Sequence, residues 1–219
     1  MTSIIKNEII KVYNNKKLFI FMALLLITQF LPIIGGIIFR INVLSGQLYP
    51  LDTIGFTTSW LLPIFFSILI AELFAEEYAQ GTLTLSLVHP ISRVKLVTAK
   101  ITAIFLILLF LLIYAMILSY AIGILAFGWG EAFTIRGTLY SPLEGILLIV
   151  GSYLLSALPL LAFSMIVVFF ALIFHSSGAV VGISLGIIIL MTFIDALFIQ
   201  ARPFLISSYF NFSNTLLFS

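Results

Sequence analysis

Residues 76–93 read EEYAQGTLTLSLVHPISR, and this polar stretch separates two long apolar segments of the chain. Two glutamates end the first apolar segment, and Lys95 and Lys100 begin the second. Ionised side chains are costly inside the hydrocarbon region of a bilayer, so a charged stretch between apolar runs belongs at a membrane surface. We therefore interpret residues 75–95 as a loop on the cytoplasmic face of a membrane protein.

The composition of the whole chain supports this interpretation. Of its 219 residues, 63% are hydrophobic and 8% are charged, and the mean hydropathy is +1.30. Soluble domains carry about 45–50% apolar and about 25% charged residues, so we expect residues 1–219 to form a single transmembrane domain. The net charge of +2 is too small to indicate a nucleic-acid partner. The absence of cysteine excludes disulfides, thiolate metal sites and cysteine nucleophiles.

Residues 1–16, which precede the first apolar run, are rich in lysine. Their apolar residues recur at helical spacing (Ile5, Ile9, Val12 and Tyr13), while Lys6, Asn7 and Lys11 lie outside this stripe. The pattern predicts an amphipathic helix that lies along the inner headgroups. The alternative is a basic flank that only fixes the orientation of the chain.

The apolar runs predict five transmembrane helices and therefore an all-α polytopic bundle. The spans cover about residues 18–39, 54–74, 96–127, 142–174 and 178–198. Pro32, together with Gly35 and Gly36, should bend the outer third of the first span. The third span is longer than a hydrocarbon core of about 30 Å and must tilt or project. Ser141, Pro142 and Glu144 have the spacing of a capping box that begins the fourth span.

The fifth span carries Gly178, Gly182 and Gly186 four residues apart, a small-residue ridge that lets another helix approach closely. Residues 200–219 are too polar and too short to cross the bilayer again. Basic residues favour a cytoplasmic N-terminus, because seven lie on the predicted inner side and three on the outer side. The inner seven are Lys6, Lys11, Lys16, Lys17, Arg93, Lys95 and Lys100, and the outer three are Arg40, Arg136 and Arg202.

The alternation within residues 82–87 would predict a strand in a soluble protein. A lone strand at a membrane surface leaves backbone groups unpaired, so we favour a short helix that uses Leu83, Leu87 and Ile91. Pro90 ends this helix, and Ser92 then caps the third span. Arg93 and Lys95 fall in the first turn of that span, where the helix dipole disfavours cations. They therefore bind lipid phosphates, bind an acidic partner surface, or only fix the orientation of the chain in the membrane.

Glu72, Glu76 and Glu77 lie at the C-terminal end of the second span, where the helix dipole disfavours carboxylates. Pairing with Arg93, Lys95 or the N-terminal lysines would compensate, and so would solvation. Exposed ion pairs contribute only about 0–1 kcal/mol, so stability alone would be a poor reason for these charges.

The 75–95 segment resembles the first cytoplasmic loop of ABC-2 type transporter permease subunits, and the order of the spans on either side also fits that family. The residues that carry the resemblance are Glu76, Gly81, Thr82, Leu83, Leu85, Leu87, Pro90, Ile91, Ser92, Arg93 and Lys100. The resemblance implies a half-transporter in the bacterial cytoplasmic membrane. It also implies two partners, a separate ATP-hydrolysing subunit and a second permease subunit, identical or different, with the N-terminal helix contacting the same ATPase.

This resemblance assigns the ATPase contact to Glu76, Glu77, Gly81, Thr82, Leu83, Leu87, Pro90, Ser92, Arg93 and Lys95. Net outward transport is the family expectation, and apolar walls with 22 Phe suit a hydrophobic or amphipathic substrate such as a peptide or an antibiotic. The family has six spans and a cytoplasmic C-terminus. Because only five spans are found, we expect a truncated sequence rather than a five-span variant.

Enzyme chemistry finds little support in the sequence. The chain has no Gly-x-x-x-x-Gly-Lys-Ser/Thr phosphate loop, so we expect ATP and Mg²⁺ to bind the partner and this chain to be neither an enzyme nor a cofactor carrier. Glu76 and Glu77 also resemble the paired glutamates of CAAX-type proteases. However, Gly81 stands where that family needs arginine, and His89 and His175 both map to inner loops.

A channel or proton-coupled carrier would need ionisable residues within the membrane. Asp195 is the candidate, but it lies near the outer end of its span, and we expect it to be exposed or capped. The alternative to a transporter subunit is a non-transporting structural or partner-binding membrane protein.

Overall fold

The protein is a bundle of long helices, seen here in a computed structural model that describes residues 2–39, 45–77, 93–130, 133–135, 138–174 and 176–210. Five helical stretches of the described chain are long and apolar enough to cross a membrane, as the sequence predicts. They are Lys16–Ile38, Tyr49–Ala75, Val94–Phe127, Pro142–Ile173 and Ser177–Leu197. The fold is compatible with a multi-pass membrane protein.

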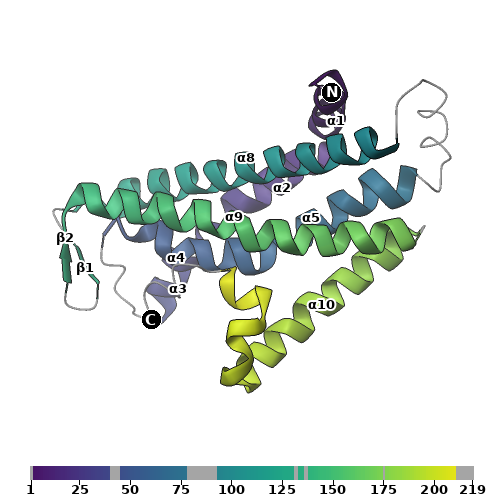
Figure 1. The fold of residues 1–219 in the computed structure, drawn as a ribbon. Helices are drawn as coiled ribbons and strands as arrows, with labels where there is room; N and C mark the ends of the chain where they lie inside the picture. Colours follow the sequence, from purple (N-terminus) through teal and green to yellow (C-terminus); the bar gives the residue numbers. More distant parts are fainter. Residues whose placement is uncertain are drawn as a thin grey trace.

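The N-terminal segment forms the predicted amphipathic helix, α1 (Thr2–Tyr13). Figure 1 shows α1 nearly end-on while the long helices run across the picture, so α1 lies across the long axis of the bundle. The next helix, α2 (Lys16–Thr28), begins where the Asn15 side chain accepts a hydrogen bond from the amide of Lys17 at 3.1 Å. This cap separates α1 from the first span.

The first span is broken, as its proline predicts. After α2, the helix resumes as α3 (Leu31–Phe39), with Pro32 as its second residue. Proline is tolerated in the first turn of a helix but not in its interior, because it has no amide hydrogen to donate. The chain therefore interrupts the helix just before Pro32 rather than at Gly35 and Gly36.

The second span begins earlier than we expected. The predicted span starts near residue 54, but α4 (Tyr49–Phe56) already includes Tyr49, Pro50 and Asp52. Pro50 lies in the first turn, and the Tyr49 side chain is fully buried, with its hydroxyl donating to the carbonyl oxygen of Gln29. Because the Tyr49 ring is buried in the bundle, the helix begins at this residue and includes Asp52.

The same span contains two wide π-helical turns. The segments after α4 are η1 (Thr57–Leu61), α5 (Leu62–Ile70) and η2 (Ala71–Glu76). π-Helical turns are rare and often lie at functional sites. Here η1 lines a pocket and η2 ends beside an ion-pair cluster, both described below.

Two longer helices pack against this span. α8 (Arg93–Phe127) has 35 residues, which at about 1.5 Å per residue gives a length of about 52 Å. α9 (Pro142–Ile173) begins with the predicted capping box, in which the Ser141 amide donates to Glu144 Oε2 at 2.9 Å and the Glu144 amide donates to Ser141 Oγ at 3.4 Å. Between them lies an antiparallel hairpin that we did not predict, β1 (Phe133–Ile135) and β2 (Thr138–Tyr140).

The chain then turns into α10 (Ser177–Leu197), which packs on α5 and η2 and diverges from α9 (Figure 1). Two short 3₁₀ helices follow, η3 (Ile199–Phe204) and η4 (Ile206–Tyr209). They return towards α9, where the buried Phe210 ring meets Phe163 edge-to-face at 5.9 Å between centroids. Residues 200–210 thus fold back on the bundle without forming a sixth span.

A buried polar network joins α4, α8 and α9 at the hairpin end of the bundle. The Tyr153 hydroxyl lies 3.2 Å from Ser119 Oγ and 3.4 Å from Thr53 Oγ1, and it donates to the Pro50 carbonyl oxygen at 3.3 Å. Inside a bilayer such groups find no water, so they must satisfy one another. The network fixes the relative position of these three helices.

The tightest backbone contacts are made by glycines that we had not singled out. The Gly46 amide donates to the Gly128 carbonyl oxygen at 3.0 Å, and a Cβ added at Gly123 would lie 2.6 Å from the Tyr49 Cβ and 2.9 Å from the Gly46 carbonyl oxygen. By contrast, a Cβ at Gly182 or Gly186 would meet nothing within 4 Å, and one at Gly178 only Ser176 Oγ at 4.0 Å. No described helix therefore approaches the predicted ridge closely, and the packing of another helix there stays a prediction.

These contacts predict opposite effects for two glycine substitutions. Gly123→Ala should lower the stability of the purified protein by about 1–3 kcal/mol, because the new methyl group meets backbone and Cβ atoms that cannot rotate away. Gly182→Ala, in the long apolar helix α10, should leave the stability unchanged or raise it slightly, because a methyl group fits there and alanine favours the helix. Thermal unfolding in detergent would measure both. Equal stability of the two variants would contradict the packing at Gly123.

Candidate functional site

The clearest concentration of buried charge lies where α1, the end of η2 and the first turns of α8 meet. Lys100 Nζ donates to Glu8 Oε2 at 3.0 Å and to Glu77 Oε2 at 2.8 Å. Only 1% of the Lys100 side chain is exposed, against 12% for Glu8 and 13% for Glu77. One lysine therefore joins the N-terminal helix to both helices that flank residues 78–92.

Local sequence explains why Lys100 points inwards. Leu96, Ala99, Ala103 and Ile104 are all buried, and the spacing of three and four residues places Lys100 on the same face of α8. Its ammonium group also lies 5.7 Å from the centroid of the Phe74 ring, a distance at which the ring face attracts a cation. The apolar stripe thus holds one charge whose partners come from other elements.

A second set of pairs connects the N-terminal lysines to the second span. Lys11 Nζ binds Glu77 Oε1, and Lys17 Nζ lies 3.2 Å from Glu72 Oε1, which also accepts from Asn15 Nδ2 at 2.6 Å. Of the partners we weighed for these glutamates, the N-terminal lysines are therefore in place. Because Lys11 and Lys17 are more than half exposed, these outer pairs contribute about 0–1 kcal/mol each.

We define the ion-pair cluster as Glu8, Lys11, Glu77 and Lys100, two carboxylates and two ammonium groups. Their formal charges cancel, which allows the group to lie partly buried. Two charges taken out of water do not necessarily stabilise a fold, but removing one partner leaves the other uncompensated. The cluster therefore acts chiefly as a constraint, because α1, η2 and α8 cannot separate without exposing a buried charge.

The sequence identified only part of this cluster. Glu77 and Lys100 were singled out as parts of the 75–95 segment, whereas Glu8 was not. The signal was present: Glu8 stands three residues after Ile5 and four before the buried Val12, within the apolar stripe of α1. A charged residue in such a stripe indicates a buried partner.

The other predicted contact residues are only partly described. Lys95 is exposed at the start of α8, next to Val94, whose side chain is 72% exposed. Glu76 ends η2 and Arg93 begins α8, but their side chains are outside the described part of the chain. Also outside it are the predicted short helix and cap, with Gly81, Thr82, Leu83, Leu87, Pro90 and Ser92.

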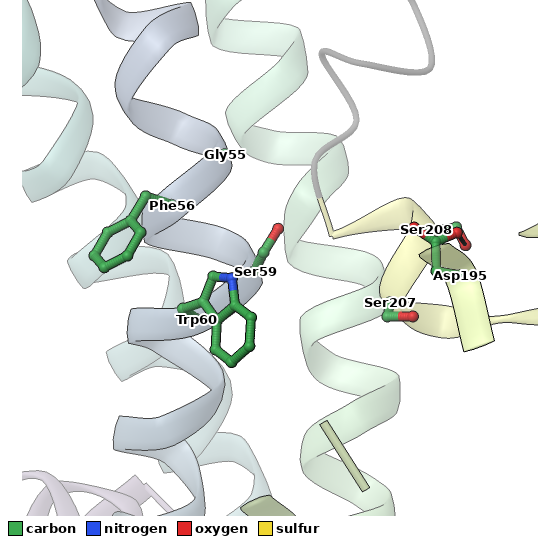
Figure 2. Close-up of a pocket in the computed structure, with 7 residues that line it drawn as sticks. All are labelled: Gly55, Phe56, Ser59, Trp60, Asp195, Ser207 and Ser208. Atoms are coloured by element: carbon green, nitrogen blue, oxygen red, sulfur yellow. Dashed lines mark hydrogen bonds between the residues drawn. The ribbon is translucent and has the colours of Figure 1, made fainter. Parts of the chain in front are cut away.

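A polar pocket lies away from the cluster, between the second span and α10. It has a volume of about 360 Å³ and is lined by Gly55, Phe56, Ser59, Trp60, Asp195, Ser207 and Ser208. Figure 2 shows Ser59 on η1 directed towards the side of Asp195 and Ser208, whereas Phe56 points away from them. A wall of hydroxyl groups and an indole ring is unusual on an apolar bundle and provides sites for hydrogen bonding.

Asp195 is half-exposed at this pocket, and its partners are local. Its Oδ1 accepts a hydrogen bond from Ser208 Oγ at 2.8 Å and lies 3.4 Å from Arg202 Nε. The side chain is thus capped by the turn that follows α10, as expected for an aspartate near the end of a span. Ser207 Oγ is buried and makes no hydrogen bond within the described residues.

Among the residues that the structure describes, no group of three or more His, Asp or Glu side chains is placed to hold a metal ion. The described side chains provide an ionic constraint at the cluster and hydrogen-bonding groups at the pocket.

Residues 42–219 match a family described as protein of unknown function, DUF2705. No curated protein and no solved structure matches the chain.

The cluster predicts a large difference between two lysines of α8. Lys100→Met should lower the free energy of unfolding by about 3–5 kcal/mol, because Glu8 and Glu77 lose a buried counter-ion. Lys95→Met, at an exposed position of the same helix, should change it by about 0.5 kcal/mol or less. Denaturant unfolding in detergent, followed by tryptophan fluorescence, would measure both.

A double variant tests whether the loss of stability comes from carboxylates that lack a counter-ion. Adding Glu8→Gln to Lys100→Met removes a stranded carboxylate and should recover part of the lost stability. Equal midpoints for the two single lysine variants, or strictly additive losses in the double variant, would contradict the role of the cluster.

Proposed function

We propose that this chain, which belongs to the DUF2705 family, is the membrane-spanning permease subunit of an ATP-driven exporter. In this proposal a separate ATPase subunit docks on residues 75–95, and a second permease subunit completes the transport path. The observation that carries the proposal is the burial of Lys100 between Glu8 and Glu77. It makes α1, η2 and α8 one unit at the place where the sequence resembles an ATPase-docking loop.

The arrangement suits the transmission of motion. Binding of ATP would bring two partner ATPases together and displace the docked segment. Because α8 is continuous from Arg93 to Phe127, a displacement at its start would reach its far end, where Gly123 packs on Tyr49 of α4. The energy of ATP would thus move the wall of the second span without any nucleotide chemistry in this chain.

The exposed start of α8 offers a surface for such a partner. Val94 and Lys95 combine an apolar and a basic side chain, both exposed, at the start of a helix, where the dipole disfavours cations. An acidic surface of an ATPase would attract the basic side chain. The alternative, a membrane protein that binds partners without transport, shares the fold but predicts no hydrolysis that depends on these residues.

The pocket of Figure 2 fits the proposed substrate class. It places the polar groups of Ser59 and Asp195 next to Trp60 on an otherwise apolar surface. An amphipathic molecule could direct its polar end to these groups and leave its apolar body against the helices.

The orientation can be tested because the chain contains no cysteine. We expect Lys95→Cys to react with a membrane-impermeant maleimide only after cells are permeabilised, because basic residues concentrate at that end. Thr138→Cys, in the hairpin, should react in intact cells. The opposite pattern would place residues 75–95 outside the cell and would exclude docking of a cytoplasmic ATPase.

Charge reversal tests the docking itself. Arg93→Glu combined with Lys95→Glu should reduce the ATPase that co-purifies with the tagged chain from its native membranes by about tenfold or more, because attraction becomes repulsion. Arg202→Glu, at the far end of the bundle, is the control and should leave the complex intact. Mass spectrometry and ATP hydrolysis in the eluate are the readouts. An undiminished ATPase complex in the double variant would refute the docking role.

A further inference from the structure

We propose that the groove between α1 and α8 binds one acyl chain of an anionic phospholipid. The groove has a volume of about 280 Å³ and lies between the N-terminal helix and the long third span. Small-molecule pockets measure roughly 300–1,000 Å³, so this groove takes part of an acyl chain and not a whole lipid.

The lining of the groove is hydrocarbon. α1 contributes Ile9, Val12 and Tyr13, and α8 contributes Leu106 and Phe110 among others. Tyr13 is 59% exposed and Phe110 51% exposed, so the groove is open along the outside of the bundle. Its polar boundary is set by α1, which lies across the bundle axis, as the amphipathic helix of a membrane surface does.

Two lysines beside the groove, Lys6 and Lys16, favour a negatively charged lipid headgroup. Lys6 lies three residues before Ile9 and seven before Tyr13, so it adjoins them on one side of α1. Lys16, the first residue of α2, stands between Tyr13 and Leu18, another groove residue. Both lysines are exposed, and neither forms an ion pair with any residue that the structure describes.

The neighbouring lysines, Lys11 and Lys17, already have carboxylate partners within the chain. Lys11 is paired with Glu77 and Lys17 with Glu72, so among the lysines of α1 and the first turn of α2 it is Lys6 and Lys16 that form no ion pair with a described residue. Cations near a membrane surface attract anionic lipids. A hydrocarbon groove under two such lysines therefore matches a phospholipid with a negative headgroup, such as phosphatidylglycerol.

The inference does not depend on the proposed transport. It concerns the attachment of α1 to the membrane, and in the ion-pair cluster Glu8, one helical turn before the groove residue Val12, binds Lys100. A bound lipid would therefore hold α1 at the groove, next to the contact that Lys100 makes.

Quenching by brominated lipids tests the proposal. The reporter is Phe110→Trp, and the control is Phe169→Trp, at a position of α9 that is 59% exposed and lies outside the groove. The unmodified chain, with Trp60 and Trp129, supplies the background. Each protein is placed in vesicles that mix phosphatidylcholine with brominated phosphatidylglycerol, or the reverse.

We expect the Phe110→Trp signal to show a preference for phosphatidylglycerol of about tenfold, from two lysines worth a few-fold each, and the Phe169→Trp signal to show almost none. Lys6→Gln with Lys16→Gln should remove the preference, and Lys95→Gln should keep it. The same preference at both tryptophans, or one that survives loss of the two lysines, overturns the proposal. Absence of quenching at position 110 by either lipid also overturns it, because protein would then cover the groove.

A second measurement does not require the reporter to fold. Native mass spectrometry of the chain without the Phe110→Trp substitution should show retained phosphatidylglycerol. The amount retained should fall several-fold in the Lys6→Gln, Lys16→Gln double variant and stay unchanged in Lys95→Gln. Equal retention in the two variants overturns the assignment of the headgroup contact.

Discussion

A single ammonium group, that of Lys100, holds together the end of the bundle where charge and apolar surface meet. It lies between Glu8 and Glu77 at hydrogen-bonding distance and is almost completely removed from solvent. Because a buried charge without its partner is strongly unfavourable, the three elements that share this group are constrained to move together. The amphipathic helix, the end of the second span and the start of the third are thereby one mechanical part.

The other helices are connected to this end of the bundle through the third span. The third span runs unbroken to the hairpin end, where Gly123 admits the Tyr49 ring and the Tyr153 hydroxyl joins two further helices. The second span, by contrast, contains two π-helical turns, and one of them lines the polar pocket. A stiff rod beside a helix with irregular turns is an arrangement in which motion at one end can alter a wall in the middle.

Much of this fold could be predicted from the sequence, because hydrophobic length and helix-capping chemistry are local signals. The five spans, the break before Pro32 and the Ser141 capping box all rest on such signals. The early start of the second span at Tyr49 and the hairpin do not, since one depends on tertiary burial and the other on short-range pairing in a loop. For the site, Glu77 and Lys100 were found as charges, but the contact of Lys100 with Glu8 joins residues 92 positions apart and depends on the packing of the helices.

Hydrogen exchange of α1 in the intact protein tests most directly whether the buried lysine anchors it. In the wild-type chain the amides of residues 5–12 should be protected, and in Lys100→Met they should exchange much faster, together with those at the end of η2. The amides of the first turns of α9, at the opposite, hairpin end of the bundle, should be unaffected. Unchanged protection of α1 in that variant, or an increase spread evenly over the whole bundle, would contradict the account.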